Sequence, residues 1–320
     1  MSDPLFSRLG RVRAAIFDPT SYRMLWLGLA GRFVEPKSLP VNQTVDRNDT
    51  PSELDGAEGD GIPRTVFQTW KTRHSLPFNF AYWRGSFLKY NPMYRHVLWD
   101  DSDNRNFIVT RFPWFVGTYD KLPTEIFRAD VIRYFFLYSF GGFYADMDSE
   151  CLRPLDDLRN GGDILVGRMG RNNSFAHSIP NAVMASVPGQ IFWLVAVAFV
   201  VERFDEASRM GTLHKMPPEQ LTGPVLFKTV VDYYLSHSQE EIAARAMPIL
   251  RYFTKSEYRF GRLKVLPPYV WYPIDWTNPA HQIFRRKMSR KRGVLTERMT
   301  KRNFQKSYVV NYWSHSWDLT

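Results

Sequence analysis

The chain has 320 residues, of which 44% are hydrophobic and 16% aromatic, and its formal net charge is +10. This content is enough to bury a full core, which excludes a largely disordered chain, and one domain with an extension fits the length better than two equal domains. The positive charge favours an acidic partner, such as nucleotide phosphate, anionic lipid or nucleic acid.

The first 60 residues are predicted to form an extension. Residues 1–40 mix apolar residues with arginines, which is compatible with a segment lying on a membrane but supports neither a signal peptide nor a transmembrane helix. Residues 41–60 are polar, acidic and free of aromatics, as is typical of a linker or disordered arm. We therefore expect one folded domain over residues 61–320.

The domain opens with alternating strand and helix patterns. A strand around Val66 and Phe67 follows a proline and ends near Trp70. A helix is predicted over residues 79–90 and a second strand over 94–99. The acidic cluster that follows, Asp100, Asp101 and Asp103, is expected to cap the next helix rather than to bind metal.

Residues 124–150 are the segment around which the rest of the chain is interpreted. Apolar residues recur at helical spacing over 124–140, and two glycines at 141 and 142 supply the stop. A short strand over 143–145 then ends where Asp146 and Asp148 emerge. The carboxyl edge of a strand is where open α/β sheets bind ligands. Cys151 follows without a nearby His or second Cys, so we interpret this only cysteine as a packing residue.

Later elements are predicted in the same way. Residues 163–167 form a buried strand, and residues 181–184 precede a helix that begins near Pro188. The longest apolar run, 191–201, would reach only ~16 Å as a helix against a hydrocarbon core of ~30 Å, so it is expected to be buried in the protein. The chain closes with a β-branched and aromatic strand that ends at His315, Ser316 and Trp317.

The spacing of Asp146 and Asp148 is compatible with a site for a metal cation. Alternate residues of an extended segment point the same way, so two carboxylates can converge on one hard cation; the alternative is an acidic turn. On the preceding helix, Asp130 and Arg133 share a face and interrupt an apolar sequence. They form either a local ion pair or part of a site, and charges held against a core often belong to a site.

The segment FRADVIRYFFLYSFGGFYADMD resembles the RxDxxRxxxLxxxGGxYxDxD block of glycosyltransferase family 32, the DXD sugar-transferase group. That group includes fungal α-1,6-mannosyltransferases and inositolphosphoceramide mannosyltransferases. The resemblance implies a GT-A fold, an α/β structure with a Rossmann-like mixed sheet flanked by helices and with helical additions. It also implies that Asp148 ligates a divalent cation, that Asp146 supports metal and ribose, and that Asp130 and Arg133 hold hydroxyls of the donor sugar.

The same resemblance assigns further residues. Trp70, in IPRTVFQTWK, would stack on the nucleotide base, and Asn181 would be a hydrogen-bonding residue of the donor site. Residues 222–224 match a TGP motif. Ser316 and Trp317 would lie beside the donor.

The metal shell departs from the family pattern. Asn311 and Tyr312 stand where relatives often carry two histidines. We therefore predict His315 as the second protein ligand of the metal, with Asn311 as the alternative.

Residues 285–306 contain ten Lys or Arg and one Glu. A solvated helical face is one interpretation, and peripheral contact with an anionic membrane is the other, since each such charge gains ~1 kcal/mol near an anionic surface. Nucleic acid is not predicted as a partner, because no zinc-finger spacing or ribonucleoprotein motif accompanies the charge.

The resemblance favours a metal-dependent retaining hexosyltransferase that uses Mn²⁺ or Mg²⁺ and a nucleotide sugar, with GDP-mannose as the expected donor. A DxD phosphohydrolase is the alternative enzyme, although Glu150 stands where such enzymes usually carry Thr or Val. A non-catalytic membrane or sugar-binding module is the third. The sequence leaves the acceptor open. It also leaves open whether the chain is cytosolic, peripheral to a membrane or, by family resemblance, in the Golgi or ER.

Overall fold

The computed structural model describes residues 24, 25, 27, 60–290 and 295–314. The predictions that concern His315, Ser316 and Trp317 lie outside this range, as does most of the expected extension. Met24 and Leu27 are buried within the described part, where they pack in a cluster with Phe284 and Met288.

A six-stranded mixed sheet forms the centre of the domain, in the order β2-β1-β3-β6-β5-β7. Strands β1, β2 and β3 are parallel, β6 runs antiparallel to both of its neighbours, and β7 is parallel to β5. In sheet order, the strands are β2 (Arg95–Trp99), β1 (Thr65–Thr69), β3 (Gly142–Ala145), β6 (Val183–Ser186), β5 (Ile164–Gly167) and β7 (Leu263–Leu266).

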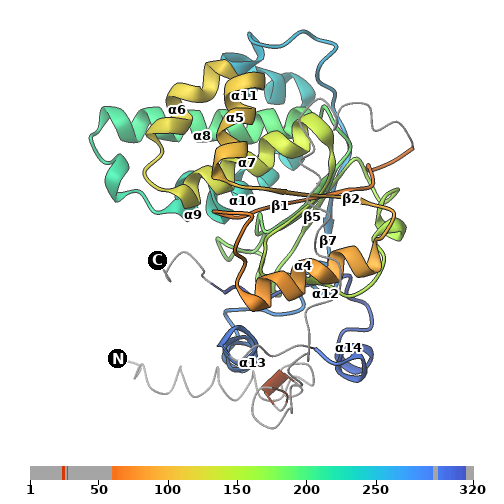
Figure 1. The fold of residues 1–320 in the computed structure, drawn as a ribbon. Coiled ribbons are helices and arrows are strands. Elements are labelled where there is room, and N and C mark those ends of the chain that lie inside the picture. The colour runs from red at the N-terminus through yellow and green to blue at the C-terminus, as the bar shows by residue number, and fades with distance from the viewer. Residues whose placement is uncertain (1–23, 26, 28–59, 291–294, 315–320) are drawn as a thin grey trace, which may run out of the picture.

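Helices cover both faces of this sheet (Figure 1). The layer above the sheet in Figure 1 comprises α5 (Asp101–Arg111), α6 (Val116–Lys121), α7 (Glu125–Phe140), α8 (Ile191–Arg209), α9 (Pro218–Leu221), α10 (Pro224–Ser236) and α11 (Gln239–Leu250). The layer below it comprises α4 (Phe78–Tyr90), α12 (Pro268–Trp271), α13 (Pro279–Arg290) and α14 (Glu297–Asn303). The predicted α/β class, a mixed sheet flanked by helices, is confirmed.

A two-stranded sheet stands beside the main one. Its strands, β4 (Ser149–Cys151) and β8 (Val309–Asn311), run antiparallel. Because β4 begins three residues after Asp146, this pairing brings the end of the chain against the DMD segment. Burial raises the pKa of the Cys151 thiol to about 12, which supports the interpretation of this residue as packing.

The local predictions hold for the first half of the domain. α4, β2 and α7 match the predicted ranges to within one residue at each end. Gly141 ends α7 with φ of +63°, a conformation that glycine adopts without the steric cost of a Cβ. The Asp100 side chain caps α5 by accepting from the amides of Ser102 and Asp103, as the acidic cluster predicted.

Two predictions need correction. Strand β6 was not predicted; it begins at Val183, within the segment expected only to precede a helix. The helix that follows begins at Ile191 rather than near Pro188. The reason is that residues 183–186 pair with both β3 and β5, a tertiary contact that local periodicity does not encode.

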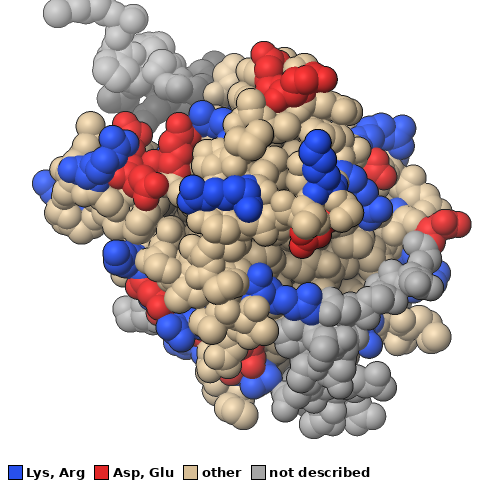
Figure 2. Space-filling view, turned by 90° about the horizontal axis from the view of Figure 1, so that it is seen from above, with Lys and Arg blue, Asp and Glu red and all other residues tan. Residues whose placement is uncertain are grey.

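The apolar run 191–201 lies in α8, whose first ten residues are buried, as expected. Among the described residues, none of the helices combines the length and apolar character needed to cross a bilayer. Figure 2 shows the face above the helical layer, where Lys and Arg are interspersed with Asp and Glu. The net positive charge is therefore not concentrated on that face.

We predict a pH-dependent loss of stability that arises at His96. Burial lowers the pKa of His96 to about 4, and its Nε2 lies 2.8 Å from the carbonyl oxygen of Asn91. The unfolded chain takes up this proton near pH ~6.5. The stability contribution is thus complete above that pH and is lost as the pH falls toward 4, by about 3 kcal/mol at most.

Urea unfolding at pH 7 and pH 4.5 checks this prediction. His96→Gln should lose less stability between the two values than the parent does, whereas the exposed control His74→Gln should follow the parent. Equal losses in the parent and in His96→Gln would contradict it.

Candidate functional site

The candidate site lies at the edge of the sheet where β1, β2 and β3 end. These strands are parallel, so Trp70, Asp100 and Asp146, which follow their last residues, all belong to that edge. Because β6 runs antiparallel to β3, it begins at this same edge of the sheet. Here the Asp146 amide donates to the carbonyl of Ala182 at 2.8 Å. The segment before β6 therefore lies beside the DMD triplet.

Arg133 joins the helix to the strand end. Its side chain is 4% exposed, and its guanidinium contacts Asp130 Oδ1 at 3.0 Å and Asp146 Oδ1 at 3.1 Å. It also donates to the carbonyl of Asn181 at 2.8 Å. The plane of the guanidinium lies over the ring of Tyr144, with Cζ 4.7 Å from the ring centroid. The predicted pairing of Asp130 with Arg133 is present, and Arg133 extends it to the DMD triplet.

Asp130 is the second buried charge. Oδ1 accepts from the Asn181 side-chain amide at 3.1 Å, and Oδ2 accepts from the Thr222 hydroxyl at 3.3 Å. A Cβ placed on Gly223 would lie 3.0 Å from Oδ2, so glycine at this position allows the TGP segment to approach the carboxylate. Asn181 and residues 222–223, assigned from the sequence by resemblance, thus meet at one carboxylate.

Burial disfavours the charged form of each group in this cluster, and the neighbouring opposite charges favour it. Burial alone would lower the pKa of Arg133, but Asp146 and Asp130 raise it above its usual range, so the guanidinium stays charged. Burial raises the pKa of Asp130, and Arg133 acts in the opposite direction. Burial likewise raises the pKa of Asp146 to about 7 against the influence of Arg133. A cation placed at Asp146 would favour its ionised form.

The geometry of the DMD triplet differs from the extended segment that the spacing suggested. Residues 147 and 148 form a turn, and the amide of Ser149 donates to the carbonyl of Asp146 at 3.0 Å. The chain must reverse here because β3 belongs to the large sheet and β4 to the small one. Both carboxylates remain partly accessible, and the Asp146 side chain is 31% exposed.

Asp148 is oriented by the end of the chain. Its Oδ1 accepts from the Asn311 side-chain amide at 2.9 Å, and its Oδ2 accepts from the Ser314 amide at 2.7 Å and from the Ser314 hydroxyl at 3.0 Å. Asn311 itself is fixed by β8. The position where relatives often carry histidine therefore lies directly against Asp148, while His315 is outside the described residues.

The donor set fits a hard divalent cation that is shared with a substrate. Within the described part of the chain, no group of three or more His, Cys, Asp or Glu side chains is arranged to hold a metal alone. Arg133 and Tyr144 both bind Oδ1 of Asp146. Oδ2 has no partner among the described residues, so it is available to a cation. One or two carboxylates with the remaining ligands from phosphate and water is a usual arrangement for Mg²⁺.

Trp70 lies directly after β1, as predicted. Its ring packs edge-on against Phe80 with centroids 4.7 Å apart, and it is partly exposed. Its indole N–H is buried and has no hydrogen-bond partner among the described residues. The ring therefore lies, partly exposed, at the edge of the sheet that carries Asp146.

Sequence reasoning missed several residues of the cluster. Tyr144 donates to Asp146 Oδ1 at 2.8 Å. Tyr134 donates to the carbonyl of Thr222 at 2.6 Å and accepts from Asn181. Ser314 binds Asp148 as described above. The only available signal was position: Tyr134 lies four residues from Asp130, and Tyr144 is two residues from Asp146, hence on the same side of the strand.

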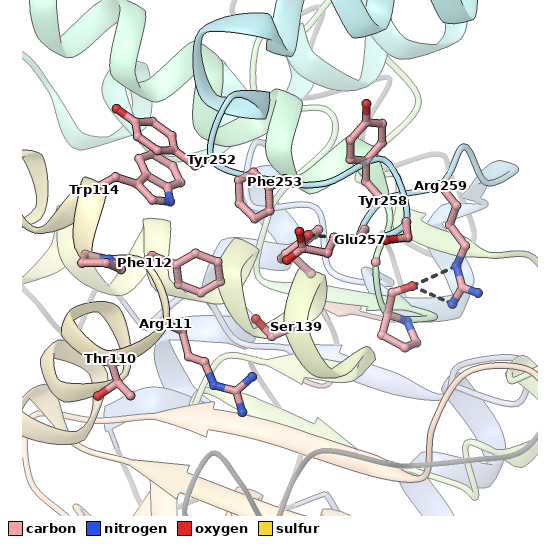
Figure 3. Close-up of a pocket in the computed structure, with 15 residues that line it drawn as sticks. Thr110, Arg111, Phe112, Trp114, Ser139, Tyr252, Phe253, Glu257, Tyr258 and Arg259 are labelled. Carbon is pink, nitrogen blue, oxygen red and sulfur yellow. Dashed lines mark hydrogen bonds between the residues drawn. The ribbon is translucent and has the colours of Figure 1, made fainter.

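A pocket of about 950 Å³ lies elsewhere on the domain. Figure 3 shows Phe112, Trp114 and Tyr252 on one side of it and Arg259 on the other. Its lining includes Ser139 near the end of α7 and Gly189 just after β6. β6 ends beside Gly142, the first residue of β3, so this pocket is at the opposite edge from Asp146. None of the predicted site residues lines it.

Comparison with known proteins agrees with the site. Residues 77–164 match the family described as "Glycosyltransferase sugar-binding region containing DXD motif". This range contains Asp130, Arg133, Asp146 and Asp148, but not Trp70 or Asn181. The resemblance to DXD glycosyltransferases is confirmed over these residues.

Three curated relatives illustrate the similarity. Inositol phosphoceramide mannosyltransferase 3 of Schizosaccharomyces pombe is 43% identical over 106 residues, which is 33% of this chain and 30% of the relative. Mannosyl phosphorylinositol ceramide synthase SUR1 of Saccharomyces cerevisiae is 36% identical over 136 residues, 42% of this chain and 34% of the relative. The initiation-specific alpha-1,6-mannosyltransferase of Candida albicans is 26% identical over 152 residues, 46% and 39% respectively.

The matches cover less than half the length of each of these relatives. Among solved structures, the PaToxG glycosyltransferase aligns with 95% of this chain and 99% of its own, with a TM-score of 0.39 and 14% sequence identity.

Proposed function

We propose that this chain transfers a hexosyl group from a nucleotide sugar to a hydroxyl of an acceptor, with a divalent cation at the DMD turn. The observation that carries the proposal is the buried pair Asp130 and Arg133, which is joined to the partly exposed Asp146 beside Asp148 at the edge of the sheet. Buried charges of this kind cost desolvation energy, and a binding site is a reason to retain them.

In this proposal each group has a separate task. Asp146 and Asp148 hold the cation, which when bound neutralises charge on the leaving diphosphate. Asp130 and Arg133 hold hydroxyls of the hexose, and Asn181 keeps Asp130 in place. Trp70 stacks on the base, and the donor contact expected of Ser316 and Trp317 concerns residues outside the described range.

Mannose is the proposed sugar, because the relatives above are named mannosyltransferases or a mannosyl-transferring synthase. GDP as the carrier, Mn²⁺ as the cation and retention of anomeric configuration follow from the family resemblance. For the acceptor, the names of the relatives include an inositol phosphoceramide. We therefore propose a glycan, a glycolipid or a small polyhydroxylated molecule.

The other two interpretations have less support. A phosphohydrolase of the DxD kind usually carries Thr or Val two residues after its second aspartate, where this chain has Glu150, and both oxygens of Asp148 are already bound by Asn311 and Ser314. A non-catalytic module would have no need of the buried Asp130–Arg133 pair. Screening nucleotide sugars for metal-dependent release of free sugar and nucleoside diphosphate tests the proposal without an acceptor, because a phosphohydrolase would instead release inorganic phosphate. Consumption of no nucleotide sugar would reject it.

We predict that removal of the Asp130 charge abolishes transfer and donor hydrolysis. Asp130→Asn keeps the side-chain volume and an oxygen that can accept from Arg133. Asp130→Ala would remove that oxygen and leave the buried guanidinium without this hydrogen-bond acceptor. Activity should fall by roughly a hundredfold or more, because a charged hydrogen bond to the sugar is lost. Nucleoside diphosphate binding, measured by calorimetry, should be retained.

The control for Asp130 is Asp120→Asn. Asp120 is a surface residue that pairs with Arg105 at 2.8 Å, and its loss should leave hydrolysis unchanged. Parent-like rates in Asp130→Asn would show that this carboxylate does not serve the donor.

We predict that His315 is a nitrogen ligand of the metal. Mn²⁺ accepts imidazole more readily than Mg²⁺ does, so His315→Ala should raise the Mn²⁺ concentration needed for half-maximal donor hydrolysis more than the Mg²⁺ concentration. Asn311→Ala acts differently, because Asn311 orients Asp148. That variant should raise the half-maximal concentrations of Mn²⁺ and Mg²⁺ to a similar extent.

The comparison of these two variants decides the ligand. If His315→Ala keeps the metal dependence of the parent while Asn311→Ala loses it, the position that relatives occupy with histidine carries the ligand, and the assignment of His315 is wrong.

We further propose that the basic segment, residues 285–306, contacts anionic membrane. α13 buries Phe284 and Met288, whereas Arg286 is exposed and the apolar Ile283 is 38% exposed. On α14, Arg298 and Arg302 are also exposed. Exposed basic side chains with an apolar neighbour are suited to the interface of an anionic bilayer.

The membrane proposal predicts weaker binding after neutralisation. Replacing Arg286, Arg298 and Arg302 by Gln should lower binding to phosphatidylserine vesicles at low salt by roughly a hundredfold at most. Donor hydrolysis should be unchanged, because Arg286, Arg298 and Arg302 are exposed and, among the described contacts, none of them binds Asp146 or Asp148. The matched control replaces Lys121, Arg209 and Lys215, which are exposed on the opposite helical layer. Vesicle co-sedimentation that is equal for both triple variants would leave residues 285–306 as a solvated face.

A further inference from the structure

Three aromatic side chains gather near the candidate donor site without a role in it. Phe175 stacks on His177 with ring centroids 5.4 Å apart and an interplanar angle of 23°. Trp276 meets both rings at steep angles, at 5.5 Å from Phe175 and 5.6 Å from His177. All three are partly exposed. We call Phe175, His177 and Trp276 the aromatic wall.

The topology places the aromatic wall at the edge of the sheet that carries Asp146. Phe175 and His177 belong to the loop after β5, and Trp276 follows β7. β5 and β7 are parallel to one another and antiparallel to β6, which is itself antiparallel to β3. Both loops therefore leave the sheet where β3 ends. Tyr272 fixes this arrangement, because its hydroxyl donates to the carbonyl of Val183 at 3.0 Å.

The loop that carries Trp276 is held in one conformation. Asp275 Oδ1 accepts from the amide of Thr277 at 2.9 Å and from its hydroxyl at 2.6 Å. The amide of Asp275 donates to His281 Nδ1 at 2.9 Å. A fixed loop presents the ring without an ordering cost when a ligand binds.

Glu219 of α9 completes the surface. The Cα of Glu219 and the Oδ2 of Asp130 lie 2.9 and 3.0 Å from the position that a Cβ on Gly223 would occupy, so Glu219 stands next to the donor-site carboxylate. Its charge acts on both Asp130 and His177, so it is near enough to influence both the cluster and the wall. Within the described part of the chain, the Glu219 carboxylate makes neither a hydrogen bond nor an ion pair. An acceptor of hydrogen bonds is therefore available there.

We propose that the aromatic wall and Glu219 form the acceptor subsite, and that it takes a neutral polyhydroxylated ring. This inference rests on the proposed function, since it names where the second substrate of that reaction binds.

The chemistry of the surface selects this ligand class. A pyranose or cyclic polyol has an apolar C–H face, which packs on an aromatic ring, and a rim of hydroxyls, which donate to a carboxylate. Glu219 and Asp130 are both carboxylates, so an anionic group at this point of the ligand would be repelled. Ligand sites commonly combine aromatic walls with a few polar groups that fix orientation.

The test measures transfer and donor hydrolysis in parallel, with methyl α-D-mannopyranoside as the acceptor probe. Trp276→Ala and Glu219→Gln should each raise the KM for the probe by roughly tenfold, because each removes a contact worth about that factor. In Trp276→Ala, the donor KM and the rate of donor hydrolysis in the absence of probe should stay within about twofold of the parent. This split separates acceptor binding from a structural role, which would lower both activities.

Matched controls come from surfaces remote from this edge. Tyr252→Ala removes an exposed ring at the opposite edge of the sheet, and Glu240→Gln removes an exposed carboxylate at the start of α11, beyond the end of α10 that is distant from Gly223. Neither should change the KM for the probe.

Three results would overturn the inference. A higher donor KM in Trp276→Ala, with an unchanged KM for the probe, would place the donor base on the wall. Transfer by the parent to water but not to the pyranoside would reject the ligand class while leaving the proposed function standing. A parent that consumes no nucleotide sugar would refute the proposed function and the subsite together.

Discussion

The buried charge of Arg133 is the constraint on which the site depends. A guanidinium that is 4% exposed is tolerated only where anions and carbonyls surround it. Asp130 comes from its own helix, Asp146 from the end of β3, and the Asn181 carbonyl from the segment before β6. Satisfying one charge therefore fixes three elements in relation to one another. The same contacts use only Oδ1 of Asp146, and Oδ2 has no partner among the described residues.

The antiparallel direction of β6 determines which other segments lie at the edge of the sheet that carries Asp146. If residues 183–186 ran parallel to β3, the segment before them would lie at the opposite edge of the sheet from Asp146. Because β6 runs antiparallel to β3, the Ala182 carbonyl can accept from the Asp146 amide at 2.8 Å. Asn181 then reaches Asp130. The loops after β5 and β7 open on the same side, and together they supply a second surface next to the donor cluster.

The sequence predicted those parts of the site that are local in the chain. Asp130 and Arg133 are three residues apart on a helix, so their shared face followed from helical geometry, and Asp100 was recognisable as a cap. The turn at residues 147–148 was not predictable, because it depends on β4 pairing with β8 about 160 residues later. The Tyr134 bond to Thr222 spans 88 residues and has no local signal. Family resemblance supplied Asn181 and residues 222–224, which composition and spacing alone would have left as loop.

The second sheet links the proposed metal site to the end of the domain. Asp148 precedes β4, and Asn311 ends β8, so pairing of these strands brings the Asn311 amide to Asp148 Oδ1. Ser314 then binds the other oxygen. Before β8 docks, Asp148 is a turn residue with no fixed orientation from these partners. The carboxylate thus acquires its orientation only when the C-terminal strand is in place, which makes the metal site a product of the completed fold rather than of the DMD triplet alone.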